Sequence, residues 1–118
     1  MGRVAARSPY LDEGVRLFKA GDYFLAHETL EEHWVEAEAS ERNFLQGLIQ
    51  LSVGLLHANK GNRKGALLQF GKSASRLEGY PDVHQGIDLA AVRAFLASAP
   101  ARLEAGEPLT PPALDAAG

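Results

Sequence analysis

The stretch SERNFLQGLIQLSVGLLHANKGN, residues 40–62, decides the fold. Apolar residues recur along it so densely that they cover well over half of a helix circumference, which is typical of a helix packed on several sides. Ser40 is expected to cap its start, and Gly61 follows its end near Lys60. The sequence therefore predicts a central helix whose apolar residues are Phe44, Leu45, Leu48, Ile49, Leu51, Val53, Leu55 and Leu56.

Four more helices are predicted from capping residues and apolar spacing. No stretch alternates in the way that a half-buried strand would. The fold class is therefore all-α, a compact bundle of about five helices. The expected bounds of the other four are Ser8 to Gly21, Asp22 to Ala37, Asn62 to Glu78, and Asp88 to a point beyond Pro100.

The helical domain is expected to span residues 9–104. Residues 1–8 are expected to be a flexible N-terminus, and the proline- and alanine-rich residues 105–118 a disordered tail. The segment YPDVHQGI, residues 80–87, is expected to be a loop with His84 at its surface.

Composition limits the functions open to the chain. The 118 residues carry a net charge of −3, which argues against a general affinity for nucleic acid. The absence of cysteine excludes thiolate catalysis and cysteine-ligated metals, so a metal would need His, Asp or Glu ligands. The first ten residues, MGRVAARSPY, do not have the apolar run of a signal peptide, and no stretch approaches the roughly 20 apolar residues that span a bilayer. A cytoplasmic location without a membrane partner is expected.

An internal repeat appears when the sequence is shifted by 40 residues. Each copy has a helix, a glycine turn, an Asp or Asn cap, and a second helix with a small residue one turn in. The first copy, residues 14–30, resembles the tetratricopeptide repeat, a helical hairpin that binds proteins. Two copies are fewer than the roughly three that a solenoid needs, which favours a compact bundle. Chance repetition of ordinary hairpin chemistry is the alternative. The matched pairs are Gly14 and Gly54, Gly21 and Gly61, Asp22 and Asn62, Ala26 and Ala66, and Leu30 and Phe70.

The second helix contains the segment AHETLEEHW, residues 26–34. Three glutamates of this helix recur every four residues on the face opposite the apolar side, where we expect them to be exposed to water. They are Glu28, Glu32 and Glu36. His27 and Glu31 fall within the apolar arc and are four residues apart, so their side chains are expected to meet.

The central helix carries a narrow polar stripe made of Asn43, Gln46, Gln50 and His57. Gly47 and Gly54 run beside it, and each costs a helix about 1 kcal/mol relative to alanine. We expect another backbone or a ligand to approach them closely. Our hypothesis is that the second helix packs there and creates a polar groove between the second and third helices. The candidate groove residues are His27, Glu31, Trp34, Arg42, Gln46, Gln50 and His57.

Several interpretations of this groove stay open. It could bind a protein or a small polar ligand, as a scaffold module would. It could instead serve a small hydrolase with His27, Glu31 and His57 in acid–base roles or as ligands of a divalent metal, although no cofactor is expected. The zinc motif H-E-x-x-H is absent because residue 31 is glutamate. A purely structural interpretation has Glu31 accepting hydrogen bonds from His27, Arg42 or a glutamine. A homo-oligomer paired through one face of the bundle is a further alternative.

Two strings, LFKAGDYFLAHETLEEHW and ERNFLQGLIQLSVGLLHANKGNRKGALLQFGKSASRL, resemble the small all-helical prokaryotic family catalogued as domain of unknown function 309. The resemblance covers roughly residues 14–88 and implies a compact helical bundle without an established activity. It also implies which positions define the family: His27, Glu28, Glu31, Trp34, Arg42, Gln46, Gln50, His57, Gly61 and Asn62.

Overall fold

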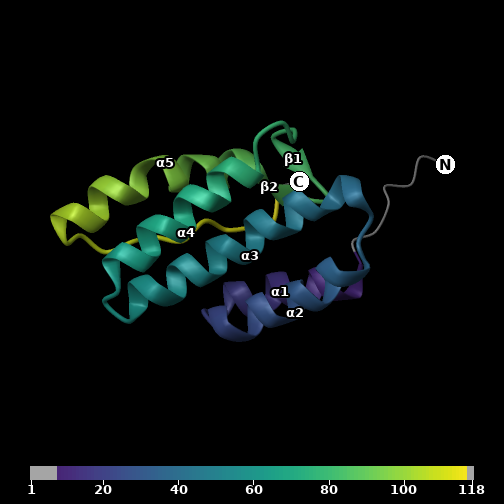
Figure 1. Cartoon of the computed structure of the whole chain (residues 1–118), viewed down its shortest axis with the longest axis horizontal. Coiled ribbons are helices and arrows are strands. Elements are labelled where there is room, and N and C mark those ends of the chain that lie inside the picture. Colours follow the sequence, from purple (N-terminus) through teal and green to yellow (C-terminus); the bar gives the residue numbers. More distant parts are fainter. Residues whose placement is uncertain (1–7, 117–118) are drawn as a thin grey trace.

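A computed structural model describes residues 8–116 and confirms an all-α bundle of five helices (Figure 1). Residues 1–7 and 117–118 lie outside the described residues, so the structure does not test the predictions made for them. Among the described helices, none is both long enough and apolar enough to cross a membrane. In chain order the elements are α1 (Pro9–Lys19), α2 (Tyr23–Glu36), α3 (Ala39–Asn59), α4 (Arg63–Arg76), β1 (Val83–His84), β2 (Ile87–Asp88) and α5 (Leu89–Ala105).

Side-chain caps start four of the helices where the sequence predicts them. Ser8, Asp22, Asn62 and Asp88 accept hydrogen bonds from the backbone N–H groups of Leu11, Leu25, Gly65 and Ala91. The start of α3 differs from the prediction. Its N-cap is Glu38, without a side-chain hydrogen bond, and the Ser40 carbonyl instead accepts from the Tyr80 hydroxyl at 2.7 Å.

The predicted repeat corresponds to two equivalent hairpins, α1–α2 and α3–α4. Gly21 and Gly61 make the turns in left-handed conformations, with φ of 82° and 76°. In the first hairpin, a Cβ on Gly14 would lie 2.8 Å from Leu30 Cδ2. In the second, a Cβ on Gly54 would lie 2.5 Å from Phe70 Cε1. The paired glycines therefore do the same thing in both hairpins, which is to let the two helices approach closely.

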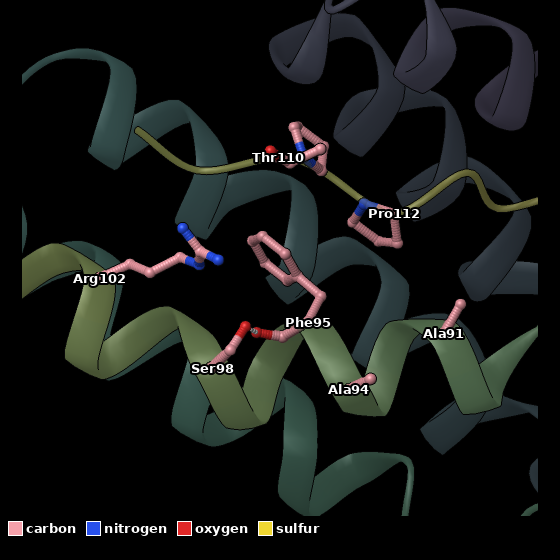
Figure 2. A pocket seen from close by; sticks show the side chains of 8 residues that line it. Ala91, Ala94, Phe95, Ser98, Arg102, Thr110 and Pro112 are labelled. Atoms are coloured by element: carbon pink, nitrogen blue, oxygen red, sulfur yellow. Dashed lines mark hydrogen bonds between the residues drawn. The ribbon is translucent and has the colours of Figure 1, made fainter. Parts of the chain in front are cut away.

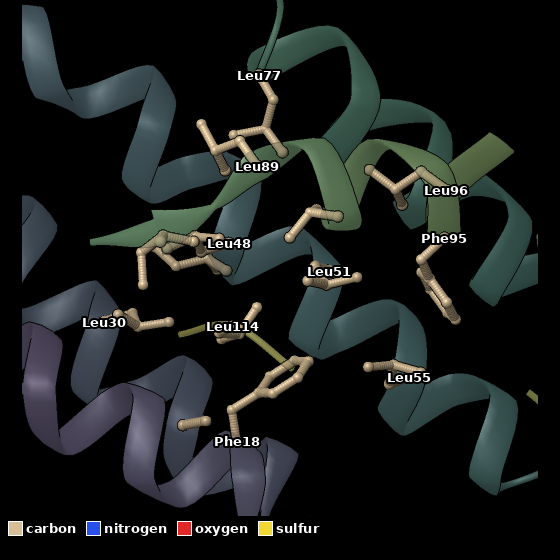
Figure 3. Close-up of a cluster of buried hydrophobic side chains, with 14 of the residues drawn as sticks. Phe18, Leu30, Leu48, Leu51, Leu55, Leu77, Leu89, Phe95, Leu96 and Leu114 are labelled. Atoms are coloured by element: carbon tan, nitrogen blue, oxygen red, sulfur yellow. The ribbon is translucent and has the colours of Figure 1, made fainter. Parts of the chain in front are cut away.

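The hydrophobic core lies around α3, which packs against α2 on one side and α4 on the other. α1 packs on α2, and α5 packs on α4. All five helices supply buried side chains to one cluster (Figure 3). This arrangement matches the prediction of a central helix covered on most of its surface.

The segment between α4 and α5 contains a short antiparallel hairpin that the sequence analysis missed. Val83 pairs with Asp88, and His84 pairs with Ile87. Gln85 and Gly86 form the turn with φ of 48° and 74°. Positive φ at both positions is typical of a two-residue hairpin turn. The expected loop is therefore a hairpin that leads directly into α5.

The expected disordered tail is wrong for residues 106–116, which run back along the bundle and end against β2 (Figure 1). The Asp88 N–H donates to the Leu114 carbonyl at 2.9 Å, and Asp115 bridges to Ile87. Leu114 is 1% exposed and lies within the cluster that contains Phe18 and Leu51 (Figure 3). Backbone pairing and the buried Leu114 thus hold this proline- and alanine-rich segment against the bundle.

Candidate functional site

His27 and Glu31 lie one turn apart on α2, but only the histidine is sheltered. The exposed fraction of the side chain is 18% for His27 and 57% for Glu31. His27 Nδ1 lies 2.6 Å from the Phe24 carbonyl oxygen, and Nε2 lies 3.7 Å from Glu31 Oε1. The expectation that Glu31 lies inside the apolar arc is wrong. The arc is narrower than expected, because α2 buries only Tyr23, Ala26 and Leu30.

The side of α3 that carries the two glycines faces α4. A Cβ on Gly47 would lie 2.5 Å from Leu77 Cδ2, and Phe70 occupies the equivalent place at Gly54. The Ser73 hydroxyl donates to the Gly47 carbonyl at 2.7 Å. The approach expected from α2 is therefore made by α4. Gln50 lies between the two glycines in the sequence and faces the same side.

At the N-terminal end of the stripe, two adjacent residues of α3 contact different neighbours. The Arg42 guanidinium lies 5.1 Å from the centre of the Trp34 ring on α2, and its Nε donates to the Ala37 carbonyl. The next residue, Asn43, accepts from Arg76 Nη1 on α4 at 2.9 Å. Adjacent residues thus reach α2 and α4, so this outer side of α3 is the floor between those two helices.

His57, at the other end of α3, belongs to the turn into α4. Its Nδ1 lies 3.2 Å from Asn62 Nδ2. Within residues 8–116, no three His, Asp or Glu side chains come close enough together to hold a metal ion. The proposed set of His27, Glu31 and His57 therefore does not form a three-ligand site.

A polar hollow of about 390 Å³ lies on the α4 side of the stripe. Its lining residues are Asn43, Gln50, Lys72, Ser75 and Arg76. Gln50 is 7% exposed, and its Oε1 is buried without a hydrogen-bond partner. An unpaired buried acceptor costs about 1–3 kcal/mol, and native structures contain few of them. The hollow is thus lined by the residue that carries this acceptor and by two cationic side chains, and it lies between α3 and α4 rather than between α2 and α3.

A second hollow of about 360 Å³ separates α5 from the tail (Figure 2). Its walls are mainly small or apolar, and two of its polar side chains have partners. The Ser98 hydroxyl donates to the Phe95 carbonyl, and Arg102 pairs with Glu107 at 3.4 Å. No polar group in it is both buried and unpaired among those described, so we prefer the hollow at Gln50.

Comparison with known proteins supports the resemblance seen in the sequence. Residues 11–68 match the family described as Domain of unknown function (DUF309). A crystal structure of a conserved hypothetical protein from Thermus thermophilus is 36% identical, with a TM-score of 0.66 over 83% of this chain and 99% of that one. The chain belongs to the DUF309 family. The similarity to the Thermus thermophilus crystal structure covers 83% of the chain, so it extends beyond residues 11–68 to most of the DUF309 bundle described above.

Two curated relatives are uncharacterized. One, from Aquifex aeolicus (strain VF5), is 27% identical over 89% of this chain. The other, the protein YpuF of Bacillus subtilis (strain 168), is 41% identical over 48% of this chain. The chain spans about a third of the length of each, 32% and 33%. Neither relative therefore indicates an activity for this DUF309 protein.

One cluster of chemically capable residues was missed by the sequence analysis. His84, expected at the surface, is 23% exposed and lies against the rings of Phe44 and Tyr80, with centroid distances of 4.6 and 5.0 Å. Its Nε2 lies 2.7 Å from Glu41 Oε1, which also accepts from Gln85 at 2.6 Å. The cluster anchors the β1–β2 turn on the start of α3. No sequence signal pairs residues 43 positions apart, such as Glu41 and His84.

Replacing Glu41 with alanine is expected to lower the free energy of unfolding by about 1–3 kcal/mol, because two partly buried donors lose their shared acceptor. Denaturant unfolding of the wild type and the variant measures this difference. The matched control is Glu38→Ala, which removes an exposed carboxylate at the same end of α3 that makes no capping hydrogen bond. Equal losses in the two variants would contradict an anchoring role for Glu41.

Proposed function

We propose that this DUF309 protein is a binding module whose α3–α4 hollow holds a small acidic group, a carboxylate or a phosphate, on a free ligand or on a protein partner. The observation that carries the proposal is a hollow lined by Lys72, Arg76 and Gln50, a residue whose amide Oε1 is buried and unpaired. Two cations supply the charge, and the amide supplies a specific hydrogen-bonding position.

The chemistry of the lining restricts the ligand. Lys72 and Arg76 are exposed donors that favour an anion, and a guanidinium can hold a carboxylate or phosphate with two hydrogen bonds. Gln50 Oε1 needs a donor. A ligand with an N–H or O–H group next to its acidic group satisfies both requirements. The Ser75 hydroxyl can donate or accept, so it adapts to either kind of acid.

The outer side of α3 supports a site larger than the hollow. Gln46 and His57 are four residues before and seven residues after Gln50, which places them along the same side of the helix. Both are partly buried. We propose that a protein partner would lie along this floor, in the way that tetratricopeptide-like hairpins hold peptides, with the α2 residues Glu31 and Trp34 at its other edge.

A ligand titration tests the proposal. The probes are N-acetylglycine, which has an amide N–H next to its carboxylate, and acetate, which has only the carboxylate. We expect N-acetylglycine to shift the amide NMR signals of Gln50 and its neighbours at lower concentration than acetate does. Arg76→Ala and Lys72→Ala should each weaken this binding about tenfold, since each removes a charge-assisted contact.

Arg63→Ala is the matched control for that titration. Arg63 is a cation on the same helix, but it does not line the hollow. The control should leave the titration unchanged. Shifts that are equally reduced by Arg63→Ala would indicate a general effect of positive charge. An absence of shifts at Gln50 with both acetate and N-acetylglycine would overturn the proposed site.

A further inference from the structure

α2 and α4 carry opposite formal charges. α2 has four glutamates and no lysine or arginine, and α4 has two lysines and two arginines and no acidic residue. With neutral histidines these helices therefore carry −4 and +4. The glutamates are Glu28, Glu31, Glu32 and Glu36, and the cations are Arg63, Lys64, Lys72 and Arg76.

The same two helices hold most of the exposed apolar side chains. Of the seven large hydrophobic residues exposed within residues 8–116, three lie on α2 and two on α4. Val35 and Leu68 are the most exposed, at 64% and 57%. Contiguous apolar surface bordered by charge commonly marks an interaction site. The five residues are Phe24, Leu25, Val35, Leu67 and Leu68.

On each of the two helices, charged and apolar side chains lie on the same outward face. Phe24, Glu28, Glu31 and Val35 follow the spacing of a single helical face, and a shallow hollow of about 340 Å³ lies among Glu28, Glu31, Glu32 and Val35. On α4 the corresponding face contains Lys64, Leu68 and Gly71, and a Cβ on Gly71 would meet nothing within 4 Å. We call these surfaces, together with Glu32 at the border of the first and Arg63 at the border of the second, the acidic face and the basic face.

The two faces cannot lie against each other within one chain, because α3 packs between α2 and α4 (Figure 1). We propose that a second copy of this chain covers them, with the acidic face of each copy against the basic face of the other. Both complementary surfaces are present on every copy, so two copies related by a two-fold axis can make the contact twice. Using both contacts also helps a small chain approach the roughly 1,200–2,000 Å² that a stable interface buries.

Light scattering and sedimentation over a range of protein concentrations test the proposal. The wild type is expected to form a dimer at low salt and to dissociate more readily at high salt, because its contacts include exposed opposite charges. Reversing the acidic face with Glu28→Lys and Glu32→Lys, or the basic face with Arg63→Glu and Lys64→Glu, should raise the dissociation constant at least about tenfold. Each variant should then be a monomer.

Mixing the two charge-reversed variants is the decisive measurement. The reversed α2 of one variant faces the reversed α4 of the other, and the two unchanged faces also complement each other, so the one-to-one mixture should form dimers again. Glu104→Lys on α5 controls for a change in net charge and should dimerise like the wild type. Thermal melting confirms that each variant is folded.

Val35→Ser and Leu68→Ser provide a second route that changes no charge, and each is expected to weaken the dimer. A wild type that stays monomeric at every concentration would overturn the proposal, and so would variants that dimerise as before or a mixture that stays monomeric. If the acidic face of each copy instead bound the basic face of the next copy in an open chain, assemblies larger than a dimer would form. That result would overturn the two-fold arrangement. None of the substituted residues lines the Gln50 hollow, so the two proposals can fail separately.

Discussion

Replacing Leu114 with alanine is expected to lower the free energy of unfolding by about 2–5 kcal/mol. Leu114 is 1% exposed and belongs to the central hydrophobic cluster, although it lies in the tail. Its removal leaves a cavity that neighbours such as Phe18 can fill only in part. Denaturant unfolding of the wild type and the variant measures the loss.

The control for this variant is Leu68→Ala, the same substitution at a side chain that is 57% exposed. It is expected to change stability by about 0.5 kcal/mol or less, when measured at a protein concentration that keeps the chain monomeric. The ion pair between Lys19 and Asp115 should contribute less than about 1 kcal/mol, because both side chains are exposed by a third or more. A loss in Leu114→Ala no greater than in the control would show that the tail does not stabilise the bundle.

The parts of the fold that local chemistry specifies were predictable. Asp22 and Asn62 begin helices because their side chains accept from N–H groups three residues on, a pattern visible in the sequence. The glycine pair Gly14 and Gly54 repeats because each admits a bulky side chain of the following helix. Such signals depend on residues close together in the chain, so a single sequence contains them.

The tail and the β1–β2 hairpin depend on contacts between distant residues. The strands have two residues each, too few for an alternating pattern, and the turn places Gln85 at a positive φ that glutamine rarely adopts. The tail is held by backbone pairing with residues 86–88, which any sequence except proline can make. Neither feature has a periodic signal, and both were therefore missed.

Only part of the candidate site was predictable: the sequence indicated Gln50 and Asn43, but not Lys72, Ser75 and Arg76 or the helix that supplies them. Helical spacing identified the polar stripe that contains Gln50, and Gly47 beside it indicated a close approach. Spacing on one helix cannot say which neighbour makes that approach. The answer depends on Leu77 and Phe70, which fit onto the glycines and bring α4, rather than α2, to the side of Gln50.

Phe70 is the site of the second large expected effect, because one ring joins three helices. It is 2% exposed, it fills the space that Gly54 leaves on α3, and its ring meets Phe95 of α5 edge-on at 5.4 Å. Replacement by alanine is expected to lower the free energy of unfolding by about 3–5 kcal/mol. Calorimetry or denaturant unfolding checks this value.

Two further variants separate the contributions of that ring. Phe24→Ala makes the same substitution at a side chain that is 49% exposed on the equivalent helix, and it should cost little. Phe70→Leu reproduces the first hairpin, in which Leu30 packs on Gly14, and it should cost about 1.5 kcal/mol or less if filling the space above glycine is what matters. A leucine variant as unstable as the alanine variant would instead assign the effect to the aromatic contact with Phe95, and the two hairpins would then be alike in shape but held together by different interactions.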